Sequence, residues 1–176
     1  SLRQRDPGWA HGGWRLRAKE AVDRVGLLGK SPPPPPFYWS AGQRRRVAIA
    51  GVLVMRPKVL VLDEPTAGLD PKGRDEILDQ VERLHKETGM TVILVSHSME
   101  DVARYVERII VLNRGEKMLD GTPREVFRHY KELEKVGLAA PQVTYVMHDL
   151  KERGFDLSPD ATTIEEAADE IMRSLS

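Results

Sequence analysis

The feature that most constrains the fold is the segment Val59-Leu60-Val61-Leu62-Asp63-Glu64-Pro65, in which four consecutive aliphatic residues end in two carboxylates. An uninterrupted aliphatic run of this length predicts a strand of a parallel sheet that is buried on both of its faces. A second such run, Thr91–Val95, follows a segment whose apolar residues have helical spacing. Strand, helix and strand in this order predict an α/β core with a mainly parallel sheet.

Further helices are expected on both sides of this core. Capping residues set several of their starts: Asp70 before Pro71, Ser98, and Thr122 before Pro123. The apolar spacing predicts helices over residues 14–25, 43–55, 71–88, 98–105, from 122 onward, and over 141–153, and a hairpin over 109–119. A last helix, capped by Thr162, is expected to turn Ile164, Ala168, Ile171 and Leu175 inward.

Composition along the chain predicts four parts. They are an unstructured lead-in at 1–13, a partial helical subdomain at 14–55, a core segment at 56–121 and a helical extension at 122–176. The run Pro32–Pro36 can be neither helix nor central strand, and we expect an extended linker, with a PxxP ligand of an SH3-like domain as the alternative. The start has no initiator Met and no apolar leader, so we expect a fragment.

Charge and residue content exclude several classes of protein. Lys and Arg together number 27, as do Asp and Glu, so no overall basic field attracts nucleic acid. The run Arg44-Arg45-Arg46 is expected to be a solvated or subunit-facing surface rather than a nucleic-acid site. The absence of cysteine excludes disulfides and thiolate metal sites. No apolar run approaches the ~20 residues of a membrane-spanning helix.

Two carboxylates and a histidine follow the predicted strands. Asp63 and Glu64 come at the carboxyl end of the first strand, where α/β folds bind ligands, and His97 follows the second. Asp63 can hold Mg²⁺ and Glu64 can polarise an attacking water. Alternatively, the two carboxylates cap the following turn and His97 is a surface residue.

A phosphate site is predicted where the helix over 43–55 begins. Small residues before a helix expose its first N–H groups, which attract anions, and here Ser40, Ala41 and Gly42 precede Gln43. The hydroxyl of Ser40 and the side-chain amide of Gln43 add donors.

Together these residues resemble the ABC ATPase family over about residues 38–121, and hence its P-loop NTPase-like fold. Ser40-Ala41-Gly42-Gln43 resembles the signature motif, Val59–Asp63 the Walker B strand, Ala67–Asp70 the D-loop, and His97 the switch histidine. The resemblance implies that Ser40, Ala41, Gly42 and Gln43 face the γ-phosphate of ATP held by a partner ATPase, with Asp70 crossing the interface. Asp63 would bind Mg²⁺, Glu64 would be the catalytic base and His97 would contact the γ-phosphate.

Two departures from the family pattern stand out. Ala41 replaces the first signature glycine and Trp39 stands at the leucine position, so the cost of the alanine depends on the sign of its φ. No G-x-x-x-x-G-K-[ST] loop occurs, and without its lysine the β- and γ-phosphates lose most of their ligands. We therefore expect this chain alone not to hydrolyse ATP.

The tail is similar to that of energy-coupling factor transporter ATPases. The similarity covers 120–127 and the later segments 137–143 and 154–157. It implies a subunit at the cytoplasmic face of the membrane that drives vitamin or metal-ion uptake. Its partners would be a second ATPase, in a homo- or heterodimer, a transmembrane coupling subunit and a substrate-binding membrane subunit, and no nucleic acid. Two alternatives stay open: a non-catalytic partner or remnant that supplies only the signature half-site, and an ABC ATPase of DNA maintenance or translation.

Overall fold

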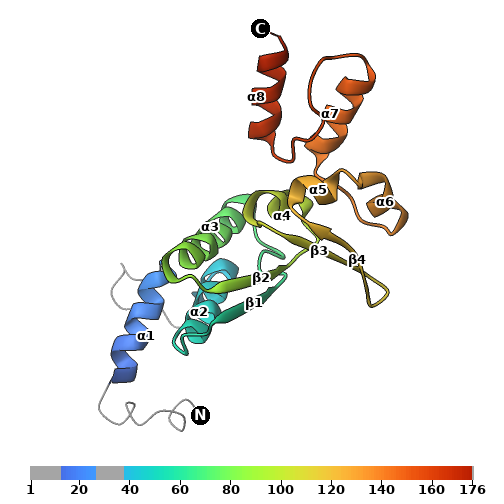
Figure 1. Ribbon diagram of the computed structural model, residues 1–176. Coiled ribbons are helices and arrows are strands. Elements are labelled where there is room, and N and C mark those ends of the chain that lie inside the picture. The colour runs from blue at the N-terminus through green and yellow to red at the C-terminus, as the bar shows by residue number, and fades with distance from the viewer. Residues whose placement is uncertain (1–12, 27–37, 176) are drawn as a thin grey trace. The chain divides into compact units, whose positions relative to one another are not determined.

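Helices and strands alternate between residues 41 and 113, as the α/β prediction requires (Figure 1). The structure is a computed structural model that describes residues 13–26 and 38–175. Its contacts divide the chain into two compact units, unit 1 up to Val95 and unit 2 from Ser96. The run Pro32–Pro36 and nearly all of the predicted lead-in lie outside the described residues, and the four-part division stays a prediction.

Unit 1 contains the predicted parallel strands. Strand β1 (Val59–Asp63) pairs with β2 (Thr91–Val95) in parallel, with Val59 opposite Thr91 and Asp63 opposite Val95. Helix α3 (Pro71–Thr88) connects them. Its ends follow the sequence signals, because Asp70 accepts a hydrogen bond from the first turn and Gly89 has the left-handed φ of 65° that a helix C-cap favours.

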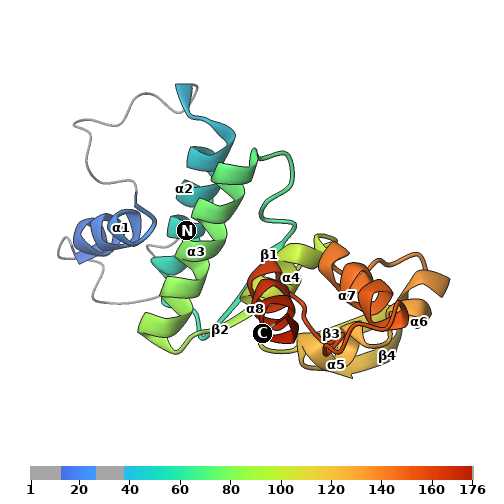
Figure 2. The same ribbon diagram turned by 90° about the horizontal axis from the view of Figure 1, so that it is seen from above.

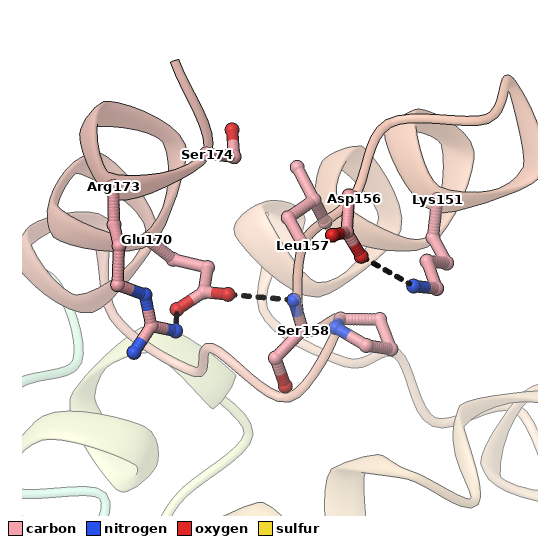
Figure 3. Close-up of a pocket in the computed structure, with 8 residues that line it drawn as sticks. Lys151, Asp156, Leu157, Ser158, Glu170, Arg173 and Ser174 are labelled. Atoms are coloured by element: carbon pink, nitrogen blue, oxygen red, sulfur yellow. Dashed lines mark hydrogen bonds and ion pairs between the residues drawn. The ribbon is translucent and has the colours of Figure 1, made fainter. Parts of the chain in front are cut away.

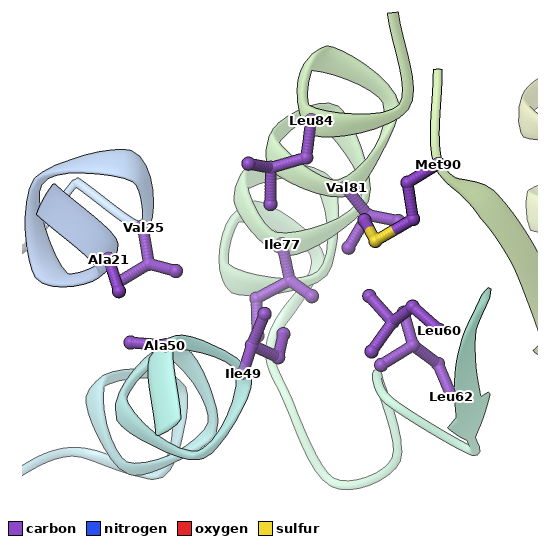
Figure 4. Packing of buried hydrophobic residues seen from close by; sticks show 10 residues of the cluster. All are labelled: Ala21, Val25, Ile49, Ala50, Leu60, Leu62, Ile77, Val81, Leu84 and Met90. Atoms are coloured by element: carbon purple, nitrogen blue, oxygen red, sulfur yellow. The ribbon is translucent and has the colours of Figure 1, made fainter. Parts of the chain in front are cut away.

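The hydrophobic core of unit 1 lies between the sheet and the helices. Helices α1 (Gly13–Arg24) and α2 (Ala41–Leu53) contribute alongside α3, and α2 and α3 lie side by side (Figure 2). The buried cluster, shown in Figure 4, comprises Ala21, Val25, Ile49, Ala50, Leu60, Leu62, Ile77, Val81, Leu84 and Met90.

The prediction that both faces of the first strand are buried is wrong. Leu60 and Leu62 are buried against the helices, whereas Val59 and Val61 are 50% and 59% exposed. On β2, Ile93 and Val95 are exposed in the same way. Among the described residues the helices of unit 1 pack on one face of the sheet only, so alternate side chains of each strand point away from the core.

Unit 2 begins with α4 (Met99–Tyr105) and an antiparallel hairpin of β3 (Ile109–Asn113) and β4 (Glu116–Gly121). Four helices follow: α5 (Pro123–Phe127), α6 (Tyr130–Lys135), α7 (Gln142–Glu152) and α8 (Ile164–Ser174). Within the described ranges, no helix is long and apolar enough to cross a membrane.

Helix α8 differs from its prediction in cap and in orientation. The N-cap is Thr163, whose hydroxyl accepts from the N–H of Glu166. Ile164 and Leu175 are 76% and 69% exposed and Ala168 is also exposed, so Ala167, with Ile171 partly buried beside it, makes the contact with the core. In this rotation Glu166 also accepts from the Thr162 N–H and from Arg124 of α5.

Candidate functional site

The candidate site of unit 1 lies at the carboxyl end of β1. Asp63 is the last residue of the strand and its side chain is exposed, and the half-buried Glu64 follows it. The N–H of Glu64 donates to the carbonyl of Val95 at 2.9 Å, which continues the strand pairing by one residue. The backbone of Glu64 then turns sharply, with a φ of 45°. This is the left-handed region, which costs an L-residue about 1–2 kcal/mol.

The turn after Glu64 is bound by Arg45 of α2. Within the turn, the N–H of Ala67 donates to the carbonyl of Glu64 at 3.2 Å. The guanidinium of Arg45 donates from Nη1 to the Glu64 carbonyl at 2.7 Å and from Nη2 to the Ala67 carbonyl at 2.8 Å.

Of the three arginines, Arg44 is exposed, as a solvated surface requires, and the subunit-facing alternative stays a prediction. Arg45 is half-buried in the turn contact, and Arg46 donates to Glu76 of α3 at 3.0 Å. The local sequence gave no signal for the Arg45 contact, because its acceptors are carbonyl groups about twenty residues away.

The predicted phosphate site forms the N-terminus of α2. Ser40 and Gln43 make a reciprocal capping box, in which Ser40 Oγ accepts from the Gln43 N–H at 3.2 Å and Gln43 Oε1 accepts from the Ser40 N–H at 2.9 Å. Because Ser40 Oγ acts as acceptor there, its own proton remains available to a ligand.

Alanine at the first signature position is compatible with this backbone. Ala41 is the first residue of α2 and is not among the residues with positive φ, so the cost that a left-handed backbone would impose does not arise. Beside it, a side chain on Gly42 would meet its first neighbour, Arg46 Nη2, only at 3.9 Å. The helix start is therefore open to a ligand at this glycine.

The predicted D-loop connects the Glu64 turn to α3. Gly68 has a φ of 72°, which only glycine adopts without strain, and Asp70 is the N-cap of α3, where Oδ1 accepts from the N–H of Gly73 at 3.3 Å. The side chain of Asp70 is exposed. In unit 1, Arg45 therefore connects the start of α2 to the Glu64 turn, and the D-loop follows that turn directly in the chain.

His97 belongs to unit 2. It lies two residues beyond β2 and its side chain is exposed. It is flanked by Ser96, whose Oγ accepts from the N–H of Ser98 at 3.1 Å, and by Ser98, which caps α4. Its action on the same ligand as Glu64 stays a prediction.

Charge interactions in unit 2 stabilise the hairpin and the extension. Hydrogen bonds from Arg108 and Lys117 hold the pKa of Asp120 far below its usual range. Two hydrogen bonds from Arg128, at 2.7 and 2.6 Å, lower the pKa of Asp160. The Arg108–Asp120 pair joins β4 to the residue before β3, and the Arg128–Asp160 pair joins the loop before α8 to the C-cap of α5.

A polar hollow of about 540 Å³ lies between α7 and α8 (Figure 3). Lys151 is 3.9 Å from Asp156, and Arg173 bonds to Glu170, which also accepts from the Ser158 N–H. The charged groups are therefore engaged with one another. None of the predicted site residues lines this hollow.

Within the described part of the chain, no three His, Asp or Glu side chains are grouped as a metal centre. Mg²⁺ in nucleotide sites usually takes one or two carboxylates and completes its shell with water and phosphate oxygens. The exposed carboxylate of Asp63 fits that mode of binding, and it does not fit a metal site built from protein side chains alone.

Known proteins resemble this chain both in sequence and in fold. A family model described as "AAA domain, putative AbiEii toxin, Type IV TA system" matches residues 31–101. The chain is 58% identical to the energy-coupling factor transporter ATP-binding protein EcfA2 of Clostridium tetani, over 89% of this chain and 55% of that protein. It is 54% identical to EcfA2 of Caldanaerobacter subterraneus subsp. tengcongensis, over 90% and 56%. The chain thus spans about half the length of these curated relatives.

Solved structures of ABC transporter ATPases are also similar to this chain. CbiO1 from Clostridium perfringens, described as part of the ABC transporter complex cbiONQ, superposes with a TM-score of 0.65 at 39% identity, over 84% of this chain and 57% of that one. The ATP-binding cassette MJ0796, solved as a dimer bound to ADP and Pi, superposes with a TM-score of 0.54 at 33% identity, over 64% and 48%.

Proposed function

Because this chain belongs to the ABC ATPase family, and within it to the energy-coupling factor transporter ATP-binding proteins, we propose that it supplies the hydrolysing and partner-facing part of a transport ATPase. In this function ATP hydrolysis drives the uptake of a vitamin or metal ion through membrane-embedded partner subunits. The chain would act from the cytoplasmic face of the membrane, as a dimer with a second ATPase subunit.

The observation that carries the proposal is the arrangement at the end of β1. An exposed carboxylate and a half-buried carboxylate follow one another across a sharp turn whose backbone is bonded on both sides. Asp63 would hold Mg²⁺, which neutralises phosphate charge when bound. Glu64 would accept a proton from the attacking water as general base.

The remaining site residues would act on phosphate groups. His97 would donate a hydrogen bond to the γ-phosphate of the nucleotide served by Glu64. The helix start at Ser40, Ala41, Gly42 and Gln43 would donate N–H and O–H groups to the γ-phosphate of the nucleotide held by the partner. Asp70 would contact the partner across the dimer interface. Each nucleotide would thus be hydrolysed only when two subunits are together.

A titration of this chain with Mg-ATP tests how much of the site it contains. The sequence lacks the lysine loop that cradles the β- and γ-phosphates, so we expect no binding in the micromolar range. Micromolar binding measured by isothermal titration calorimetry would contradict the assignment of this chain to the half of the site without that loop.

Hydrolysis itself is tested in a chimera that completes this chain with the part of the Clostridium tetani relative that it does not match. We expect Glu64→Gln in the chimera to bind Mg-ATP and to accumulate as a nucleotide-bound dimer without turnover. The control is Glu82→Gln on α3, where Glu82 pairs with Lys86 on the surface. Unchanged turnover in Glu64→Gln would remove Glu64 from the role of base.

A second candidate is a non-catalytic partner that supplies only the signature half-site. The intact cap at Ser40 and Gln43, which leaves the Ser40 proton available to a ligand, favours it. A subunit of this kind would restore turnover to a related ATPase whose own signature serine is substituted. The proposed hydrolytic function instead requires that Glu64→Gln abolish turnover at one site of the dimer.

A further inference from the structure

Arg45 connects two parts of the candidate site that are about twenty residues apart in sequence. Its guanidinium donates to the carbonyls of Glu64 and Ala67, at 2.7 and 2.8 Å. The two carbonyls belong to the first and last residues of one turn, and a planar guanidinium can donate to both at once. Arg45 itself lies two residues beyond Gln43, within the first two turns of α2.

Glu64 adopts a backbone conformation that its own sequence does not favour. A φ of 45° is strained for any residue except glycine. Such a conformation persists only where its neighbours fix it, and here both backbone polar groups of Glu64 are bonded. The N–H donates to the end of β2, and the carbonyl accepts from Arg45 and from the Ala67 N–H.

We propose that Arg45 is a positioning residue that holds Glu64 in its left-handed backbone, and thereby sets the direction of the Glu64 carboxylate relative to the start of α2. A change of φ at Glu64 swings the side chain to another side of the strand end. Because the same guanidinium holds Ala67, the first residue of the D-loop is fixed with it. The role of the carboxylate rests on the function proposed above, but the backbone contact does not.

The contact also gives α2 a mechanical connection to the Glu64 turn. The N-terminus of α2 is the segment that would face the partner's nucleotide, and Arg45 lies on that helix. A displacement of the α2 start is therefore passed to the carbonyl of Glu64 through two short hydrogen bonds with a charged donor. In this way each subunit's general base responds to what its signature helix contacts.

The neighbouring Arg46 is a matched control. It lies on the same helix and carries the same charge, and it also makes a contact outside α2, with Glu76 of α3 at 3.0 Å. Its guanidinium bonds to α3, whereas the carbonyls of the Glu64 turn accept from Arg45. Arg46→Ala thus removes one arginine and one contact between helices, and it leaves the turn intact.

The deciding experiment is nuclear magnetic resonance on this chain with Arg45→Ala and Arg46→Ala. In Arg45→Ala we expect the ¹³Cα and ¹³Cβ shifts of Glu64 to leave the range of left-handed residues. Exchange of the Ala67 amide should accelerate roughly ten- to a hundredfold, the range for the loss of one hydrogen bond with a charged partner. In Arg46→Ala both should stay as in the unsubstituted chain. Unchanged Glu64 shifts in Arg45→Ala, or equal changes in both variants, would overturn the proposal.

A rescue experiment tests whether Arg45 stabilises the strained backbone of Glu64 in particular or the fold in general. Glycine adopts positive φ without cost, so Glu64→Gly combined with Arg45→Ala should return Ala67 exchange to within about threefold of Glu64→Gly alone. A full loss of protection in the double variant contradicts the strain argument. If Arg45→Ala does not fold, the same shifts are measured in Arg45→Lys. Lysine keeps the charge, but it can donate well to only one of the two carbonyls. Glu64 shifts in Arg45→Lys identical to those of the unsubstituted chain would overturn the proposal.

The catalytic consequence is measured in the chimera described above. Arg45→Lys should lower kcat for ATP at least tenfold and leave KM within about twofold, because the base is misdirected while nucleotide contacts stay in place. An unchanged kcat would contradict positioning by Arg45. A chimera that hydrolyses no ATP even with Arg45 present would instead refute the proposed function, and the resonance experiment would still decide the contact.

Discussion

The one-sided sheet of unit 1 predicts a sharp difference between adjacent residues of β1. Leu60 is 3% exposed and faces the helices, whereas Val61 is 59% exposed on the opposite face. Leu60→Ala deletes three buried carbon atoms, worth about 0.8 kcal/mol each, and leaves a cavity, so the expected loss of unfolding free energy is about 2–5 kcal/mol. Val61→Thr keeps the β-branched shape on an exposed face, and its expected cost is within about 0.5 kcal/mol.

Urea unfolding followed by circular dichroism measures both variants. We expect a clearly lower midpoint for Leu60→Ala and an unchanged midpoint for Val61→Thr, with equal m-values. Amide exchange of β1 and β2 assigns the effect to unit 1. If Val61→Thr cost as much as Leu60→Ala, the exposed face would be covered in this chain in solution, and the one-sided packing would be refuted.

Two further predictions concern caps and charges. Gly89→Ala places a side chain at a φ of 65° and should cost about 1–2 kcal/mol, whereas Gly51→Ala inside α2, where the added carbon meets nothing within 4 Å, should not destabilise unit 1. In unit 2, Arg128 lowers the pKa of Asp160, so their pairing stabilises the fold above the ordinary Asp pKa of about 3.9 and loses this effect as pH falls toward the lower folded value. Asp160→Asn should lower the urea midpoint at pH 7, and below pH 4 its midpoint should fall less steeply than that of the unsubstituted chain. An equally steep fall would contradict the assignment of this pH dependence to the Arg128–Asp160 pair.

Strands and helix ends that depend on neighbouring residues in the chain could be predicted from the sequence. The aliphatic runs at Val59–Leu62 and Thr91–Val95 became parallel strands, and Asp70, Ser98 and Thr122 are the N-caps of α3, α4 and α5. Each of these features depends on residues within about four positions of one another. A capping hydroxyl or a left-handed glycine therefore identifies its helix end without knowledge of the rest of the fold.

The features that were missed depend on distant neighbours. Val61 is as aliphatic as Leu60, and only the placement of the helices decides which of the two is buried. In α8, apolar side chains occur on two faces, and the buried one is the face of Ala167 and Ile171, which packs against distant Met147 and Leu157. The bonds from Arg45 to the Glu64 turn have no short-range signal at all, because their partners are carbonyl groups that every residue carries.

The two sheets have very different connections, and this affects the order in which they form. Strands β3 and β4 are connected by a tight turn of Arg114 and Gly115, whereas β1 and β2 are connected by a long segment that contains the whole of α3. A hairpin closes in about 1–10 μs, while the entropy of closing a loop grows with its length. During refolding we therefore expect the β3–β4 hairpin to acquire protection first. The pairing that places Glu64 beside Val95 should be among the last events, so the site completes itself only after most of the chain is in place.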